Sequence, residues 1–164
     1  MPLERFSAAW REQYVQGTAL PSSGCVFCEL GTQEVAESTG VLWRSRHSYV
    51  ALNAFPYGSG HLLVLPYAHV GELDALDEEQ YEDLFWTMRL TVRALGRAYG
   101  ADGLNIGMNL GKAAGAGIPD HLHAHVLPRW NGDTNFMTTI GETRVLPESL
   151  ASTWAKVHGA LNIP

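Results

Sequence analysis

Cysteine, basic charge and long apolar runs are scarce in this sequence of 164 residues. It has only two cysteines, and a chain of this length buries enough surface to fold without disulfide bonds. It has 11 basic against 17 acidic residues and a net charge of −6, which argues against a general nucleic-acid binder and a membrane-surface helix. No window approaches the roughly 18 apolar residues of a transmembrane helix. Residues 1–17 lack the unbroken apolar stretch of a signal peptide, so we expect a cytoplasmic protein with no nucleic-acid or membrane partner.

What the sequence does contain is typical of a globular domain, with 46% hydrophobic and 17% charged residues. The expected helices and strands are mixed along the chain without regular βαβ alternation, which predicts an α+β fold. The apolar spacing predicts helices over 5–16 and 78–99, one or two strands over 41–53, a central strand over 61–66, and further strands over 102–110 and 121–127. We expect Pro128 to end the last strand, and the glycine-rich stretch 111–120 to be a loop.

Both cysteines lie in one short motif, Gly24-Cys25-Val26-Phe27-Cys28, directly after a Pro-Ser-Ser-Gly turn. This spacing suits a metal site, in which two thiolates leave two zinc positions for histidines. It also suits a redox pair, although such a pair follows a strand and residues 21–24 do not look like one. Plain structural cysteines are the third interpretation.

Three histidines occupy alternate positions in His121-Leu122-His123-Ala124-His125, which places them on one face of a strand. The outer two would be about 13 Å apart, so all three cannot bind one metal without distortion. We therefore expect a division of labour, in which one end histidine meets the cysteines and the others carry out chemistry.

A neutral imidazole with one free nitrogen is a competent nucleophile towards phosphorus, and a neighbouring imidazole can protonate the leaving oxygen. Backbone N–H groups in the loop 111–117 suit phosphate oxygens, and Lys112 or Arg129 would add positive charge. The pattern indicates nucleotidyl transfer.

Four motifs follow one another along the chain. They are Cys25-Val26-Phe27-Cys28, Asn53-Ala54-Phe55-Pro56-Tyr57-Gly58-Ser59-Gly60-His61, Pro66-Tyr67-Ala68-His69 and His121-Leu122-His123-Ala124-His125-Val126-Leu127-Pro128-Arg129. Together they resemble the histidine triad (HIT) superfamily of nucleotide hydrolases and transferases. The resemblance covers about residues 25–136, so we expect one HIT-like domain over 1–164 with a core at 25–136 and a C-terminal extension at 137–164.

The resemblance implies a five-stranded antiparallel sheet with helices, usually in a homodimer that joins two such sheets. It implies that His123 attacks the α-phosphorus and forms a covalent nucleotidyl-histidine, which is released to water or phosphate with AMP as a product. His125 would contact the scissile phosphate or the leaving oxygen. The other implied substrate-binding residues are Asn53 at the ribose hydroxyls, His61 beside the nucleophile, Asn109 at a phosphate and Gly115 in the phosphate loop.

Members of the family with a Cys-x-x-Cys motif hold a structural zinc, which here implies the ligands Cys25, Cys28, His69 and His121. The sequence leaves open whether Mg²⁺ accompanies the substrate. The alternatives are an exposed loop histidine for His69 and a turn residue for Asn53. Phe27, Val41, Trp43 or Leu52 would form an apolar pocket for the base.

The chain differs from fragile-histidine-type hydrolases, which have a glutamine where Gly117 stands and a loop one residue shorter. The stretch from Pro128 to Met137 resembles a bacterial branch that includes diadenosine tetraphosphate phosphorylases. The favoured hypothesis is therefore cleavage of dinucleoside polyphosphates, by water or by phosphate. The alternatives are a nucleoside phosphoramidase, against which the extended tail weighs, a zinc-stabilised nucleotide-binding module, and a purely metal-dependent hydrolase.

Overall fold

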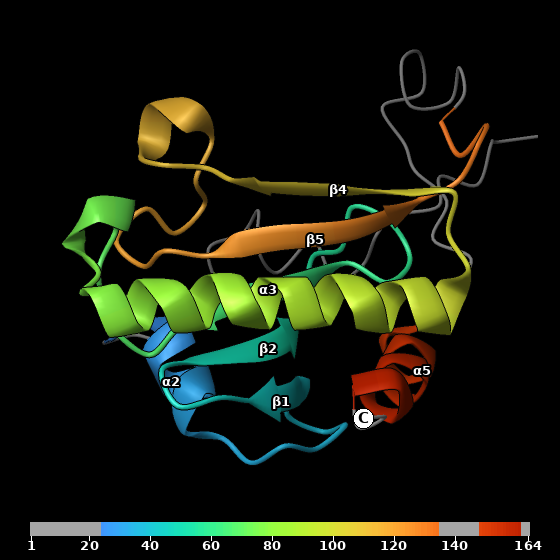
Figure 1. Ribbon diagram of the computed structural model, residues 1–164, viewed down its shortest axis with the longest axis horizontal. Helices are drawn as coiled ribbons and strands as arrows, with labels where there is room; N and C mark the ends of the chain where they lie inside the picture. The colour runs from blue at the N-terminus through green and yellow to red at the C-terminus, as the bar shows by residue number, and fades with distance from the viewer. Residues whose placement is uncertain (1–23, 135–147, 162–164) are drawn as a thin grey trace, which may run out of the picture.

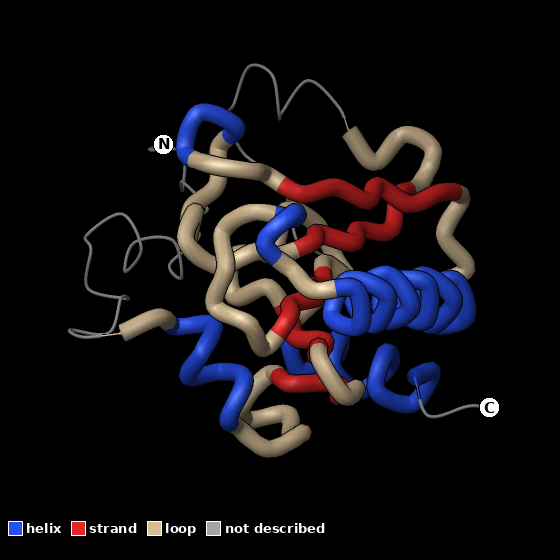
Figure 2. The backbone as a smooth tube through the Cα atoms, turned by 60° about the vertical axis from the view of Figure 1, so that its left-hand side comes forward, coloured by secondary structure: helices blue, strands red, loops and turns tan. Residues whose placement is uncertain are grey.

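One five-stranded antiparallel sheet lies between two helical layers in the computed structural model, which describes residues 24–134 and 148–161. The strands lie in the order β1-β2-β3-β5-β4. Helices α3 and α5 cover one face of the sheet and α2 covers the other (Figures 1 and 2). The expected α+β fold with five strands is confirmed. The expected helix over 5–16 lies outside the described residues.

The strands follow the expected segments, except that the strand expected over 121–127 begins only at Ala124, so that His121 and His123 precede it. Their bounds are β1 Val41–Arg44, β2 Ser48–Leu52, β3 Leu62–Pro66, β4 Gly103–Met108 and β5 Ala124–Arg129. All residues of β2 and β3 are buried, because helices pack on both faces of the central strands. The expected central strand is thus confirmed as β3.

Successive side chains of the inner strands point to opposite cores. On β3, Leu62 and Val64 pack towards α3 and α5, whereas Leu63 and Leu65 pack towards α2. The residues Leu122 and Ala124 likewise face α3. The histidines between them are therefore left on the α2 side, which is how the sheet positions the site.

Helix α3, Glu78–Tyr99, has the expected bounds. Asp77 and Gln80 form a reciprocal capping box at its start, and Gly100 ends it in the left-handed conformation with φ 55°. Its buried residues pack on the sheet, among them Leu84, Met88 and Leu95.

Two helices were not expected from the sequence. Helix α2, Val26–Thr32, begins directly after Cys25, and the hydroxyl of Tyr49 on β2 donates a 2.6 Å hydrogen bond to the carbonyl of Phe27. Helix α5, Leu150–Leu161, packs beside α3. Its Trp154 indole N–H and His158 Nδ1–H donate to the β1 carbonyls of Val41 and Leu42, at 3.0 and 3.1 Å.

Pro128 does not end β5, contrary to expectation. The strand continues to Arg129, and Pro128 lies opposite Leu104 of β4. The pairing of β5 with β3 ends at Val126, so β4 is the only strand paired with β5 at Pro128 among the described residues. The missing N–H of Pro128 therefore removes no hydrogen bond to β3. Two short 3₁₀ helices, η1 (Leu73–Ala75) and η2 (Lys112–Ala114), interrupt the loops, and no helix of the described residues is long and apolar enough to cross a membrane.

The glycine at the start of β3 is a sensitive position for stability. Gly60 has φ +74°, and a Cβ there would lie 2.7 Å from Pro128 Cγ and 2.9 Å from the Tyr99 ring. Gly60→Ala should therefore cost about 3 kcal/mol, from backbone strain plus overpacking. Gly100→Ala is the matched control, since its φ is +55° but nothing lies within 4 Å, and it should cost only about 1 kcal/mol. Urea unfolding measures both, and equal losses would contradict the close packing at Gly60.

Candidate functional site

Three histidines from two elements converge beside the α2 face of the sheet. His123 and His125 come from the segment that enters β5, and His61 immediately precedes β3. The ring centroids of His61 and His125 are 5.1 Å apart, and those of His123 and His125 are also 5.1 Å apart. His61 is 1% exposed and His123 is 6% exposed, so their hydrogen-bond partners determine which nitrogens can react.

His123 has one nitrogen fixed and one available. Its Nδ1–H donates to the carbonyl oxygen of His121 at 2.8 Å. The proton is thus on Nδ1, and Nε2 carries the lone pair that a nucleophile needs. The Phe27 ring packs 5.0 Å from the imidazole of His123 and keeps it in place.

The two ring nitrogens of His125 have different surroundings from those of His123. Its Nδ1 lies 2.9 Å from His61 Nε2, and its Nε2 is buried without a hydrogen-bond partner among the described residues. Burial, followed by the nearby His123, lowers the pKa of His125 to about 4, so this imidazole is neutral at neutral pH.

A cavity of about 370 Å³ opens at these histidines. One part of its wall is apolar and the other carries polar or backbone groups. The apolar residues include Val26, Phe27, Leu30, Leu52, Leu63 and Ile118, and the polar part includes Asn53, Asn109, Gly115, His123 and His125. Of the four residues expected to form a base pocket, Phe27 and Leu52 line this cavity. Val41 is fully buried, and Trp43 packs on Trp86 of α3.

Asn53 both lines the cavity and closes a turn. It lines the cavity, and its Oδ1 accepts a 2.9 Å hydrogen bond from the Phe55 backbone N–H, closing a turn. Its Nδ2 lies 3.3 Å from His61 Nδ1. Gly115, with φ 90°, brings the loop backbone to the same cavity as Asn109.

Tyr57 is a site residue that the sequence analysis did not single out. Its ring lies 4.5 Å from that of His61 and stacks on that of His125 at 5.5 Å, and it lines the cavity. Its backbone N–H donates to His61 Nδ1 at 2.9 Å. Its position four residues before a buried histidine, in a loop of small residues, is the only sequence signal that could have found it.

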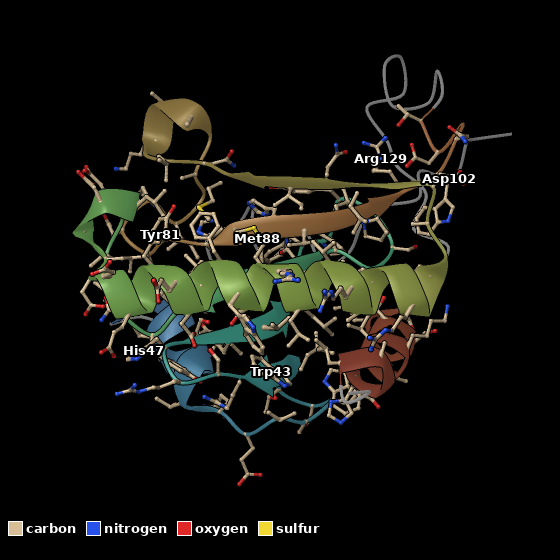
Figure 3. All side chains as sticks on the ribbon, viewed as in Figure 1. Trp43, His47, Tyr81, Met88, Asp102 and Arg129 are labelled. Carbon is tan, nitrogen blue, oxygen red and sulfur yellow. The ribbon has the colours of Figure 1, made fainter. Side chains whose placement is uncertain are left out.

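Neither expected cation contributes charge to the cavity. Arg129 is ion-paired with Asp133, at 2.6 Å from Nε to Oδ2, and donates to Asn105. This ion pair lowers the pKa of Asp133. At the same end of the paired strands β4 and β5, the Asp102 carboxylate accepts a hydrogen bond from the Asn131 backbone N–H (Figure 3). Lys112 lines a different groove, together with Gly71 and Asp120.

A cluster of potential metal ligands lies next to the cavity. It consists of Cys25, Cys28, His69 and His121, whose ligand atoms all lie within 4.8 Å of one another. His69 Nδ1 is 3.3 Å from Cys28 Sγ, and His121 Nδ1 is 3.4 Å from Cys25 Sγ and 3.5 Å from Cys28 Sγ. Tetrahedral bonds of zinc to sulfur and nitrogen would put such atoms about 3.5 Å apart.

The chemistry of these four groups fits a metal ion. His121 Nε2–H donates to the Pro66 carbonyl at 2.9 Å, so its Nδ1 lone pair is directed at the two sulfurs. Burial lowers the pKa of His121, which keeps that lone pair available. Burial and then the neighbouring Cys25 raise the pKa of the Cys28 thiol, and a divalent cation would offset this cost of placing two thiolates together.

Comparison with known proteins identifies the family to which this chain is similar. Residues 35–132 match the HIT domain family. The AP-4-A phosphorylase of Mycobacterium tuberculosis is 41% identical over 113 residues, which are 69% of this chain and 58% of that protein, so the chain spans under two thirds of that relative. The bis(5'-adenosyl)-triphosphatase of Saccharomyces cerevisiae is 34% identical over 91 residues, 55% of this chain and 44% of that one.

A solved structure of similar fold also shares part of the sequence. The zinc-bound histidine triad family protein of Mycobacterium smegmatis superposes with a TM-score of 0.67 and is 29% identical. The match covers 84% of this chain and 93% of that one. The family match over more than half of the residues, together with this shared fold, shows that the chain belongs to the HIT domain family.

Proposed function

We propose that this protein cleaves dinucleoside polyphosphates, such as diadenosine tetraphosphate, through a nucleotidyl intermediate on His123. One observation carries the proposal: His123, whose Nδ1–H is held by the His121 carbonyl, lines the same cavity as His125, whose Nε2 has no hydrogen-bond partner among the described residues. A nucleophile beside a hydrogen-bond donor is what displacement of one phosphate from another requires. The related phosphorylase and triphosphatase support this substrate class.

The substrate would lie with its base in the apolar part of the cavity, against Phe27 and Leu52. Asn53 would contact the ribose hydroxyls. Asn109 and the loop backbone at Gly115 would contact phosphate oxygens, because backbone N–H groups of a glycine-rich loop suit anions. This arrangement would bring the α-phosphorus to His123.

In the first step, a bond forms between His123 Nε2 and the α-phosphorus, and the bond from that phosphorus to the bridging oxygen breaks. The electron pair stays on the departing polyphosphate, to which His125 Nε2–H donates a hydrogen bond. In the second step, water or inorganic phosphate attacks the nucleotidyl-histidine, giving AMP or ADP. The 41% identical relative named a phosphorylase supports phosphate as the acceptor.

We further propose that the cluster of Cys25, Cys28, His69 and His121 holds a structural zinc. Four ligands close the coordination shell of zinc and leave no position for water, which is the arrangement of a structural site. The ion would fasten the start of α2 to the strand that carries the histidines, and so would hold Phe27 against His123.

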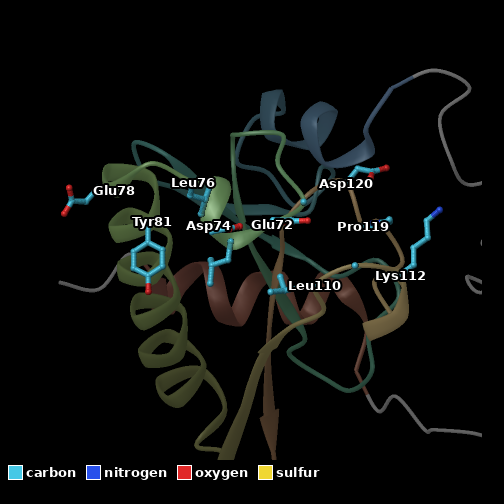
Figure 4. Close-up of a pocket in the computed structure, with 12 residues that line it drawn as sticks. Glu72, Asp74, Leu76, Glu78, Tyr81, Leu110, Lys112, Pro119 and Asp120 are labelled. Carbon is cyan, nitrogen blue, oxygen red and sulfur yellow. The ribbon is translucent and has the colours of Figure 1, made fainter.

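A homodimer is proposed from the exposed surface along β4. This strand is an edge of the sheet, and its Ile106 is 50% exposed. Leu110 is 47% exposed and faces Tyr81 of α3 across a groove of about 1110 Å³ (Figure 4), and Phe85 packs on Tyr81. Large apolar side chains beside an unpaired strand edge suit a second copy of the chain, which would extend the sheet.

Product analysis tests the proposed activity. Diadenosine tetraphosphate is incubated with and without inorganic phosphate and Mg²⁺, and the nucleotides are separated. ATP and AMP without phosphate would identify a hydrolase, and ADP with ATP only in its presence would identify a phosphorylase. His123→Ala should lower the rate by about 1,000-fold or more, because the nucleophile is lost. His47→Ala, outside the cavity, is the matched control and should keep full activity. Absence of both product pairs, or an active His123→Ala, would overturn the proposal.

Metal analysis tests the zinc site. Purified protein should contain about one zinc per chain. Cys28→Ser should lose it and unfold at a temperature about 5–10 °C lower, with less effect on activity per folded molecule. His158→Asn, which changes a histidine far from the cluster, should retain the metal. An unchanged melting temperature and zinc content in Cys28→Ser would refute the assignment.

Sedimentation tests the dimer. The wild-type protein should sediment as a dimer, and Ile106→Glu should sediment as a monomer at the same concentration, because a charge would be buried unpaired. Val35→Glu changes an apolar residue that is 39% exposed elsewhere and should leave the dimer intact. A dimeric Ile106→Glu would place the interface on another surface.

A further inference from the structure

The C-terminal end of helix α2 is bound by an arginine from another element. Arg44 is the last residue of β1, and its Nη1 donates to the carbonyl of Gly31 in the last turn of α2 at 2.6 Å. Its Nη2 donates to the carbonyl of Gln33, the residue directly after the helix. One guanidinium, with its donors in a fixed fork, therefore binds two carbonyls at this end of α2.

These hydrogen bonds satisfy groups that the helix itself cannot pair. The last carbonyls of a helix have no partner within it. In α2 the carbonyl of Leu30 accepts from the backbone N–H of Gln33 at 3.1 Å, whereas the carbonyl of Gly31 is bound by Arg44. The last turn of α2 has no basic residue, so Arg44 also brings the positive charge that stabilises a helix C-terminus.

Two tyrosines connect Arg44 to the start of α2. Arg44 Nη1 also donates to the hydroxyl oxygen of Tyr67 at 2.9 Å, and its Cζ lies 5.7 Å from the centre of the Tyr67 ring. Tyr67 stacks on the buried Tyr49 of β2, whose hydroxyl donates to the Phe27 carbonyl. Burial is the main reason that the pKa of Tyr49 lies well above its ordinary value, so this hydroxyl keeps its proton and donates.

The helix packs closely against these tyrosines and also forms the apolar wall of the cavity. A Cβ added at Gly31 would lie 3.3 Å from Tyr49 Cε1 and 3.4 Å from Tyr67 Cδ1. Three apolar residues of α2 line the cavity, namely Val26, Phe27 and Leu30. A helix of seven residues is not stable alone, so the groups that hold α2 also decide where this wall lies.

We propose that Arg44 is a positioning residue that holds helix α2 by its C-terminal end and thereby sets the affinity of the cavity for the base of a nucleotide. The proposal rests on the proposed function and deepens it, because it names a residue outside the cavity on which substrate binding depends. Arg44 is not among the described residues that line the cavity. The proposed metal site would hold the other end of α2, at Cys25 and Cys28.

A wall that is in place before the ligand arrives binds it more tightly than a wall that must first be ordered. The apparent Kd rises as the binding-competent position of α2 becomes less populated. Loss of the Arg44 hydrogen bonds should therefore weaken binding of the base. The phosphate contacts proposed for Asn109 and Gly115 should persist, because these residues belong to the loop after β4 and not to α2. His123 likewise keeps its hydrogen bond to the carbonyl of His121.

Two ligands test the proposal by NMR titration of the full-length protein. AMP carries a base and ribose 5-phosphate does not, so the ratio of their dissociation constants isolates the contribution of the base. Arg44→Met should raise the Kd of AMP by about tenfold and that of ribose 5-phosphate by no more than about twofold. Proportional changes in both constants, or no change in either, would overturn the proposal.

The next arginine along the chain provides the matched control. The Arg46 side chain is 77% exposed and pairs with Glu79 of α3. Arg46→Met removes the same charge without touching α2, so both dissociation constants should stay within about twofold of their wild-type values. An equal loss of AMP affinity in Arg46→Met and Arg44→Met would assign the effect to net charge and overturn the proposal.

Two conservative variants grade the effect. Arg44→Lys keeps the charge, but one ammonium cannot reproduce the fork that binds both carbonyls, so the Kd of AMP should rise by about threefold. Tyr67→Phe keeps the stacked ring and removes the hydroxyl that accepts from Arg44, and should also raise this Kd by about threefold. If Arg44→Met does not fold, these two variants carry the comparison, and a wild-type Kd for AMP in both would overturn the proposal.

Kinetics and hydrogen exchange separate positioning from general stability. With diadenosine tetraphosphate, Arg44→Met should raise KM by about tenfold and keep kcat within about twofold, because the nucleophile is unchanged. Amides 29–33 of the unliganded variant should exchange about tenfold faster, while those of α3 keep their wild-type rates. A lower kcat with an unchanged KM would show loss of folded protein only, and would assign Arg44 a packing role.

The two proposals fail in different ways. If the protein binds AMP but cleaves no dinucleoside polyphosphate, the proposed function is wrong, and the AMP and exchange measurements still decide the role of Arg44. If cleavage occurs and Arg44→Met binds AMP as the wild-type protein does, the proposed function survives and the role of Arg44 does not. If the wild-type protein neither binds AMP nor cleaves the substrate, both proposals fall.

Discussion

The hydrogen bond from the main chain to one nitrogen of each histidine is the constraint on which the site depends. The Pro66 carbonyl holds Nε2 of His121, the carbonyl of His121 holds Nδ1 of His123, and the Tyr57 N–H holds Nδ1 of His61. Imidazole has two nitrogens and, when neutral, one proton, so fixing one nitrogen decides the role of the other. The same side chain is thereby suited to the proposed metal site at His121 and to the proposed nucleophilic role at His123, while at His61 it directs Nε2 towards His125.

The second constraint is the short helix α2, which serves two sites at once. Its first residues follow Cys25, and Cys28 lies one position after Phe27. The Phe27 ring contacts both His121 and His123, at 5.6 and 5.0 Å. A helix of seven residues is too short to be stable alone, so its position depends on the Tyr49 hydroxyl and on the cysteine–histidine cluster. The wall of the cavity is thus coupled to the proposed metal site.

Local patterns predicted the elements in which one periodicity dominates. Helix α3 combines a capping box, an apolar stripe and a terminal glycine, and the structure places its ends where those signals lie. Helix α2 has no side-chain cap and only seven residues, and α5 has a weaker pattern in a segment rich in small residues. The prediction that Pro128 ends the last strand was wrong. A proline disrupts a strand only where a neighbouring strand would accept a hydrogen bond from the missing N–H, and the sequence does not show where the neighbouring strand ends.

The sequence by itself determined that three histidines alternate with apolar residues along one segment, of which the structure forms only the part from Ala124 into strand β5. Periodicity also predicted that Leu84, Met88 and Leu95 of α3 face the sheet, but it did not show that the apolar Tyr81 and Phe85 of the same helix are 43% and 38% exposed. Only the tertiary structure decided that the His121 carbonyl holds Nδ1 of His123, that Tyr57 donates its backbone N–H to His61, and that Arg129 is ion-paired with Asp133. The direction of each hydrogen bond depends on which donor and acceptor groups from different elements come into contact. Periodicity within one element does not show which groups of other elements it will contact.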